Sequence, residues 1–303
     1  MRITDHALAL TCGVPQGSIL GPLLFLIYFN DFERCLKYSS VYKFADDTVI
    51  FLSSKHREEV ENRLNLDLQY VSTYFGTNEL VINLKPGKTE SMLFSTSKKL
   101  SSGNSLNLKY DFHDVSSTSE YKYLGTILDQ TLSFNTNFHK SYKKASGKLR
   151  LLWSLKCYIP NEVLSKIYEA VLLPGILYNC TINLNHNATQ LSLLSSIDRR
   201  ICRLTEMEQT PIINKMKKSA VILVKKFICG HFGQDIPNLF TVKNHGKSTR
   251  NNGFILEIPL VKLQLTKSMF RSMGVTIYND LPLSHRQIDE FSAFKEAVSK
   301  YFK

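Results

Sequence analysis

The spacing of hydrophobic residues changes near Phe134, and this change limits the folds that the chain can adopt. Before Phe134, short β-branched and aromatic runs alternate with turn residues, which is typical of strands. After it, apolar residues recur every three or four positions over long stretches, which is typical of amphipathic helices. We therefore expect an α+β unit with an antiparallel sheet over residues 1–130, followed by helices. The 303 residues, 43% of them hydrophobic, suffice to bury such cores.

Two of the short runs flank an acidic pair. Val41–Phe44 and Thr48–Leu52 stand on either side of Ala45-Asp46-Asp47. This order predicts a hairpin with both carboxylates at its tip, on strands that bury Phe44, Val49 and Phe51.

The rest of the first part should contain one long helix and two further strands. Apolar residues recur at helical spacing from Val60 to Phe75, behind glutamates that the helix dipole favours. The other predicted elements are a turn at Lys85-Pro86-Gly87-Lys88, strands at Glu90–Ser95 and Tyr121–Leu128, and polar loops at Ser95–Asn104 and Asp111–Ser119.

Three apolar stripes beyond Phe134 predict a small basic helical bundle over residues 131–210. The first runs from Tyr142 to Leu152, and the third from Leu191 to Leu204. The second, from Val163 to Leu172, should end at Pro174-Gly175. Residues 211–303 form a C-terminal region of unknown role, in which we expect a final helix through Phe291, Phe294, Val298 and Tyr301.

The excess of positive over negative charge is confined to the second part of the chain. Up to Phe138, 13 Lys and Arg stand against 15 Asp and Glu, a net charge of −2, whereas from His139 onward 25 stand against 11, a net charge of +14. This asymmetry indicates a segment that holds a polyanion beside one that performs acidic-site chemistry. A Lys-rich but functionally neutral helical surface is the alternative.

Several protein classes are disfavoured by the sequence. The first residues contain no apolar signal region, and the longest apolar run, Ile19–Phe29, is too short to span a bilayer. The six cysteines show no C-x-x-C spacing, so we expect neither a zinc site nor a disulfide partner. An intracellular protein, cytoplasmic or nuclear, with no membrane partner follows.

Asp46 and Asp47 are the strongest candidates for chemistry. Phosphoryl transfer by two divalent cations needs hard oxygen ligands close together, and adjacent aspartates at a rigid turn supply them. Asp pairs also occur in turns for their local hydrogen bonds alone, so the pair by itself does not decide between the two interpretations.

The surrounding motifs resemble reverse transcriptases of non-LTR (LINE-type) retrotransposons. Gly13-Val14-Pro15-Gln16-Gly17, leading into an apolar segment, is similar to polymerase motif B, and Phe44-Ala45-Asp46-Asp47 to motif C. Val81–Phe94 resembles motif D, and Tyr121–Gly125 resembles motif E, the primer grip. The basic helices look like the thumb of this family, and Tyr278–Pro282 resembles a tail that follows it.

The resemblance implies an RNA-directed DNA polymerase that transfers nucleotides to a primer 3′-OH with two Mg²⁺ or Mn²⁺ ions. Its partners would be an RNA template, a DNA primer and deoxynucleoside triphosphates. The implied roles are metal binding for Asp46 and Asp47, a leaving-group contact for Lys88, a nucleotide and template pocket for Pro15, Gln16 and Gly17, a primer grip for Tyr123, Leu124 and Gly125, and nucleic-acid backbone contacts for Lys143, Lys144, Lys148 and Arg150.

The chain departs from the family pattern at its start. Motif A, which supplies another metal-binding Asp, and the fingers have no counterpart here, and Asp5 is the sole acid before Gly13. We therefore expect a truncated chain that is inactive alone, with a hairpin that lacks its neighbouring strand and exposes an apolar face. The alternative functions are a non-catalytic nucleic-acid-binding remnant that uses the basic helices and, with less support, a metal-dependent nuclease.

Overall fold

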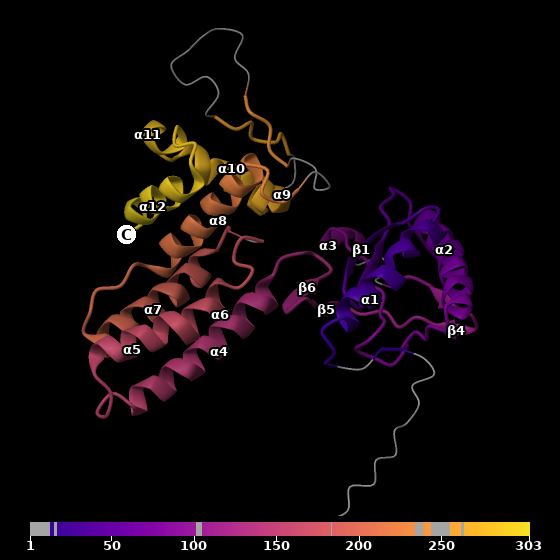
Figure 1. Ribbon diagram of the computed structural model, residues 1–303, viewed down its shortest axis with the longest axis horizontal. Helices are drawn as coiled ribbons and strands as arrows, with labels where there is room; N and C mark the ends of the chain where they lie inside the picture. The colour runs from indigo at the N-terminus through magenta and orange to yellow at the C-terminus, as the bar shows by residue number, and fades with distance from the viewer. Residues whose placement is uncertain are drawn as a thin grey trace, which may run out of the picture. The chain divides into compact units, whose positions relative to one another are not determined.

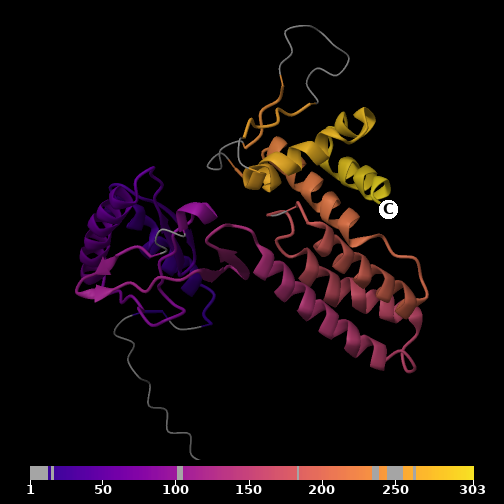
Figure 2. The same ribbon diagram turned by 180° about the vertical axis from the view of Figure 1, so that it is seen from behind.

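The computed structural model describes residues 13–14, 17–100, 105–182, 184–233, 239–243, 255–261 and 264–303. The chain divides into two compact units, Met1–Thr131 and Leu132–Lys303 (Figures 1 and 2). In the described ranges, no helix combines the length and apolarity needed to cross a membrane.

The first unit combines helices with small sheets, which agrees with the expected α+β class. Its helices are α1 (Gly21–Tyr28), the 3₁₀ helix η1 (Asn30–Cys35), α2 (Arg57–Thr77) and α3 (Ser97–Leu100). Its strands are β1 (Ser40–Phe44), β2 (Asp47–Phe51), β3 (Lys109–Tyr110), β4 (His113–Asp114), β5 (Glu120–Tyr123) and β6 (Thr126–Asp129). The described strands form three antiparallel pairs, β1-β2, β3-β4 and β5-β6.

Helix α2 organises the core of the first unit and confirms the helix predicted there. Its apolar stripe buries Val60, Leu64 and Val71. Val60 and Leu64 pack with residues near β3 and β4, whereas Val71 packs against Phe29, which follows α1, and Phe32 of η1. One long helix therefore contributes to both apolar clusters of the first unit.

Three local predictions for the first unit were wrong. Glu90–Ser95 is an extended segment with a single parallel bridge, Ser91 to Ser117, because the Ser95 N–H bonds to Gln130 instead of extending that pairing. Tyr121–Leu128 is a hairpin, β5 and β6, because Leu124 and Gly125 reverse the chain. The expected loops contain helix α3 and strand β4.

The second unit is helical in its described residues. Its elements are α4 (Asn135–Ser154), α5 (Asn161–Ile167), the π-helical η2 (Tyr168–Leu172), α6 (Leu173–Leu177), α7 (Ala188–Thr205), α8 (Ile212–Ile228), α9 (Gln264–Ser268), α10 (Phe270–Asn279), α11 (Leu283–Arg286) and α12 (Phe291–Tyr301). The predicted stripes on α4, α7 and α12 are confirmed, although Leu191 and Tyr301 are exposed.

Helix α8 joins two apolar clusters of the second unit. Its first half contributes Ile212 and Met216 to a cluster with α4, α5 and α7, and its second half contributes Val221 and Val224 to a cluster with α10 and α12. Neither α8 nor α10 was predicted from the sequence.

The second predicted helix does not end at Pro174-Gly175. It continues through α6 to Leu177 because a π-helical turn precedes the proline, and the Leu173 N–H bonds to the Tyr168 carbonyl five residues back. Two residues expected on its buried face, Val163 and Val171, are exposed.

Candidate active site

The acidic pair lies at the tip of the β1-β2 hairpin, as predicted. Phe44 pairs with Asp47, so Ala45 and Asp46 form a two-residue loop. Ala45 has φ 53°, a left-handed conformation that costs a non-glycine residue about 1–2 kcal/mol. Both aspartates are exposed. The tight turn therefore holds two carboxylates in solvent on adjacent residues.

The two faces of the hairpin differ from the prediction. Tyr42, Phe44 and Phe51 are 67%, 64% and 41% exposed, while Val41 and Ile50 join the core. The expected burial of Phe44 and Phe51 was therefore wrong, because strand alternation places them on the face opposite Val41 and Ile50. The expected exposed apolar face is present in the described residues, where the Tyr42 and Phe51 rings stack at 5.1 Å.

Two sets of hydrogen bonds hold the hairpin against the helices. Lys43 Nζ donates to the carbonyl oxygens of Phe29 and Asn30, at 3.1 and 2.8 Å, where α1 ends and the helix dipole favours a cation. Asp67 of α2, fully buried, accepts backbone N–H groups of Lys37 at 2.9 Å and Ser39 at 2.7 Å. Asp67 therefore holds the segment that leads into β1, and Lys43 holds the strand itself against the end of α1.

The motif B segment leads into α1. Ser18 Oγ accepts a hydrogen bond from the Gly21 N–H at 3.0 Å, and Pro22 occupies the first turn. Gly17 has φ 82°, a conformation that favours glycine. An added Cβ would meet nothing within 4 Å, so this backbone conformation, and not a lack of space, favours glycine here. Pro15 and Gln16 lie outside the described residues.

The Lys88 turn is confirmed and well braced. Pro86 and Gly87, with Gly87 at φ 80°, occupy the central positions of a turn closed by the Lys88 N–H and the Lys85 carbonyl at 3.1 Å, as in type II turns. Glu90 Oε1 accepts the Gly87 N–H at 2.8 Å. The Lys88 side chain is exposed.

Strand β5 connects this turn to the acidic hairpin. The Tyr121 hydroxyl donates to the Lys88 carbonyl at 2.8 Å. Burial, and then the charge of the nearby Asp47 carboxylate, raise the pKa of both Tyr121 and Tyr123. The first unit therefore brings together Asp47, the Lys88 turn and the strand that ends at the predicted primer grip.

The predicted primer grip is a hairpin tip rather than part of one continuous strand. Tyr123 pairs with Thr126, and the two residues between them have φ 43° at Leu124 and 81° at Gly125. Positive φ at both loop positions is the type I′ pattern, in which asparagine is usual at the position that leucine holds here. Asparagine or glycine at this position would relieve the strain, and backbone strain of this kind is frequent at functional sites.

The described residues contain no group of three or more His, Cys, Asp or Glu that could hold a metal ion. The two aspartates still suit magnesium, which is commonly bound through one or two carboxylates together with substrate phosphates and water. Asp46 and Asp47 would hold such an ion, and it would supply positive charge to the reacting phosphate.

The predicted backbone contacts lie on α4 of the second unit, a helix that carries no acidic residue. Lys143, Lys144 and Arg150 are exposed. Lys148 is half-buried and its Nζ donates to the Val171 carbonyl at 3.2 Å, so it also has a structural contact. Of the four residues predicted to contact a nucleic-acid backbone, three are therefore exposed, and Lys148 is held by a hydrogen bond to η2.

Sequence reasoning missed Lys43 and Asp67. Asp67 had a detectable signal, because it interrupts the apolar stripe of α2 beside Leu64 and Leu68, where a charged residue is expected only with buried partners. Lys43 had none, since a lysine within a strand is ordinary at a surface.

Residues 2–128 match the family model described as reverse transcriptase (RNA-dependent DNA polymerase). Curated proteins similar to the chain include the RNA-directed DNA polymerase from mobile element jockey of Drosophila funebris, 28% identical over 176 residues, which are 55% of this chain and 19% of the relative. The probable RNA-directed DNA polymerase from transposon X-element of Drosophila melanogaster is 24% identical over 208 residues, 66% of this chain and 22% of the relative.

A third relative is the retrovirus-related Pol polyprotein from type-1 retrotransposable element R1 2 of Nasonia vitripennis, 27% identical over 178 residues, 55% of this chain and 42% of the relative. The chain spans about a fifth of the length of the jockey and X-element proteins. No solved structure matches the chain. Because the 208 matched residues and the 66% of this chain that they cover exceed the 131 residues of the first unit, the similarity to the X-element protein includes part of the second unit.

Proposed function

We propose that this chain, whose residues 2–128 belong to the reverse transcriptase family of non-LTR retrotransposons, supplies part of the nucleotidyl-transfer site of an RNA-directed DNA polymerase. The observation that carries the proposal is the convergence of three segments in the first unit. Asp47 acts electrostatically on Tyr121 and Tyr123, and Tyr121 bonds to the backbone of Lys88.

In the proposed reaction, the primer 3′-oxygen forms a bond to the α-phosphorus of a deoxynucleoside triphosphate. The bond to the bridging oxygen breaks, pyrophosphate leaves, and the proton of the 3′-hydroxyl passes to solvent. Asp46 would be the principal ligand of Mg²⁺ or Mn²⁺ and Asp47 a weaker one, and the bound metal would supply positive charge to the reacting phosphate. The exposed Lys88 lies on the braced turn, where its ammonium offsets negative charge on the departing pyrophosphate.

The remaining predicted residues position substrates. Pro15, Gln16 and Gly17 would line the pocket for the incoming nucleotide and the template base, and Tyr123, Leu124 and Gly125 would hold the primer end. In this assignment the first unit is part of the palm and the helices after Phe134 act as a thumb. The template is RNA, the primer is DNA, and the protein works inside the cell, in the cytoplasm or the nucleus.

Primer extension on an RNA template tests the proposal. The assay uses a chimera in which this chain replaces the matching segment of the Drosophila funebris jockey protein. We expect magnesium-dependent synthesis, and an Asp46→Asn chimera should lose roughly 10³-fold or more in rate, because a metal ligand is removed. Asp114→Asn, which neutralises an exposed acid of β4, is the matched control and should retain activity.

Two results would contradict the proposal. One is a folded chimera that carries both aspartates and makes no DNA. The other is full synthesis by the Asp46→Asn chimera. The chain by itself should not extend the primer, because only two carboxylates are available for the ions among its described residues.

A second candidate function is binding of nucleic acid without catalysis, through the exposed cations of α4. It is favoured by the absence of acidic residues in that helix and by the net charge of +14 from His139 onward. The two functions differ in one respect, since binding alone would be insensitive to Asp46→Asn.

A further inference from the structure

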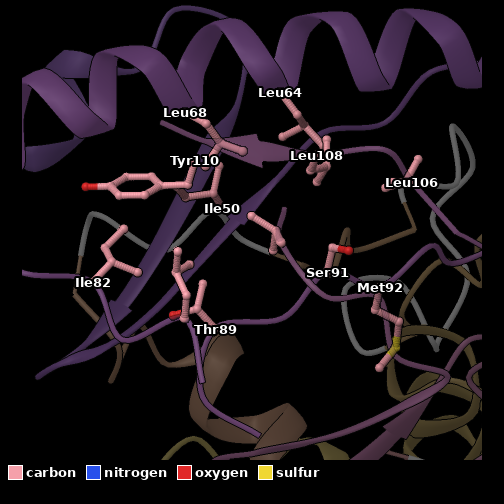
Figure 3. A pocket seen from close by; sticks show the side chains of 12 residues that line it. Ile50, Leu64, Leu68, Ile82, Thr89, Ser91, Met92, Leu106, Leu108 and Tyr110 are labelled. Atoms are coloured by element: carbon pink, nitrogen blue, oxygen red, sulfur yellow. The ribbon is translucent and has the colours of Figure 1, made fainter. Parts of the chain in front are cut away.

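A cavity of about 120 Å³ that is partly open to solvent lies in the first unit (Figure 3). Its walls come from β2, α2, the extended segment around the Lys88 turn, and the stretch that includes β3 and β4. Ile50, Leu64, Leu68, Thr89 and Leu108 represent these four walls. Figure 3 shows the side chains of Leu64 and Leu68 descending from the helix toward Ile50. The cavity therefore lies where the main elements of the unit meet.

The lining of this cavity is chemically uniform. It consists mainly of aliphatic side chains, with one methionine, the ring of Tyr110 and the hydroxyl groups of Thr89 and Ser91, and it includes no charged residue. The Ser91 hydroxyl donates to the Ser116 carbonyl at 3.3 Å and is thus engaged by the protein. A water molecule needs two to four polar partners to be held at a fixed position, and this lining offers few.

We propose that this cavity is a binding site for a compact, uncharged aromatic molecule. An engineered cavity of about 150 Å³ with a similar aliphatic lining binds benzene, so the volume here suits a single ring. A charged ring is excluded, because no lining residue would compensate for the loss of its hydration.

The position of the cavity gives such a ligand contact with two important segments. Ile50 belongs to β2, the strand that begins with Asp47, and Thr89 directly follows Lys88. A bound ring would pack against both and fill the space between them. The binding site itself stands on geometry alone and does not depend on the proposed polymerase function.

The test measures benzene binding to the whole purified chain by calorimetric titration and by thermal unfolding. We expect saturable binding and a rise of several degrees in the melting temperature of the first unit, since a ligand that binds only the folded state stabilises it. Leu68→Phe, which places a ring in the cavity, should weaken binding at least about tenfold. Leu64→Ala, which enlarges the cavity, should retain binding even if the phenylalanine variant fails to fold.

Matched controls make the result specific to this cavity. Leu191→Ala, which truncates a leucine of the second unit that is 40% exposed, creates no enclosed cavity and should leave benzene affinity unchanged. Benzoate should not bind. The proposal is overturned if neither the natural chain nor Leu64→Ala binds benzene, if folded Leu68→Phe binds it with undiminished affinity, or if benzoate binds equally well.

Discussion

At the scale of single residues, Asp67 shows how one buried charge positions the candidate site. Its carboxylate has no exposure and accepts N–H groups from Lys37, Tyr38 and Ser39, directly before β1. Hydrogen bonds to an ionised acceptor are among the stronger ones in proteins. The backbone that leads into the acidic hairpin is therefore fixed by a side chain that does not belong to the site.

Asp67→Ala should destabilise the first unit by about 2–4 kcal/mol, because it leaves three part-buried backbone donors without their acceptor. Urea unfolding followed by circular dichroism measures this loss. Asp114→Asn, an exposed acid on β4, is the control and should change stability by less than about 0.5 kcal/mol. An Asp67→Ala chain as stable as the natural one would show that these donors find other partners.

His186 should make the second unit sensitive to acid. Burial lowers the pKa of His186 below its ordinary value of 6.5, so the unfolded chain binds the proton more readily than the folded one. The contribution that the neutral His186 makes to the stability of the unit is therefore fully present above pH 6.5 and is lost as the pH falls below it. Thermal melts between pH 8 and pH 5 should show this decline, and His186→Phe, whose ring would retain packing against Phe138, should reduce it.

At the scale of elements, the β5-β6 hairpin stores strain at its tip. Leu124 has φ 43°, a region in which asparagine and glycine are favoured over leucine. Leu124→Asn should raise the stability of the first unit by about 1 kcal/mol, measured by urea unfolding. Leu128→Asn, on β6 of the same hairpin, is the control and should not stabilise. A loss of stability in Leu124→Asn would mean that leucine packing outweighs the strain.

Helix α4 should account for much of any nucleic-acid affinity. Neutralising Lys143, Lys144 and Arg150 to glutamine should lower the slope of log affinity against log salt by about 2–3 for duplex DNA, as three phosphate contacts are lost. Fluorescence anisotropy over a salt series measures the slope. The control replaces Lys295, Lys300 and Lys303 by glutamine, an equal change of charge at exposed positions near the end of the chain. Equal effects of both triple variants would indicate nonspecific attraction.

The elements also show what the sequence could and could not predict. The stripe on α2, the acidic hairpin and the Lys88 turn were predicted because each depends on local spacing or on Pro and Gly. The burial of Phe44 was mispredicted because two-residue alternation defines two faces without saying which one meets the core. The helix through Pro174 was mispredicted because a π turn depends on packing that no local pattern encodes. The roles of individual site residues remain predictions.

At the scale of the whole molecule, the chain is two compact units with separate apolar clusters and opposite charge character. The acids of the candidate site belong to the first, and the excess of lysine and arginine belongs to the second. Family similarity covers the first unit most directly and reaches the second.

Because their apolar clusters are separate, the two units should unfold in distinguishable steps. Leu194→Ala, in the core of the second unit, should lower one calorimetric transition by several degrees and leave the other unchanged. Leu64→Ala should have the converse effect. A single transition that shifts equally in both variants would show that the units unfold as one cooperative body.

The π turn at Tyr168–Leu172 amounts to one residue inserted into a helix. Each α-helical residue rotates the chain by about 100°, so the insertion sets the direction in which every later side chain of that helix points. Leu164 lies before the π turn, Tyr168 begins it and Ile176 lies after it, yet all three reach the same core. Removing a single residue between them would swing Ile176 a quarter of a turn or more away, so the length of this segment matters as much as its composition.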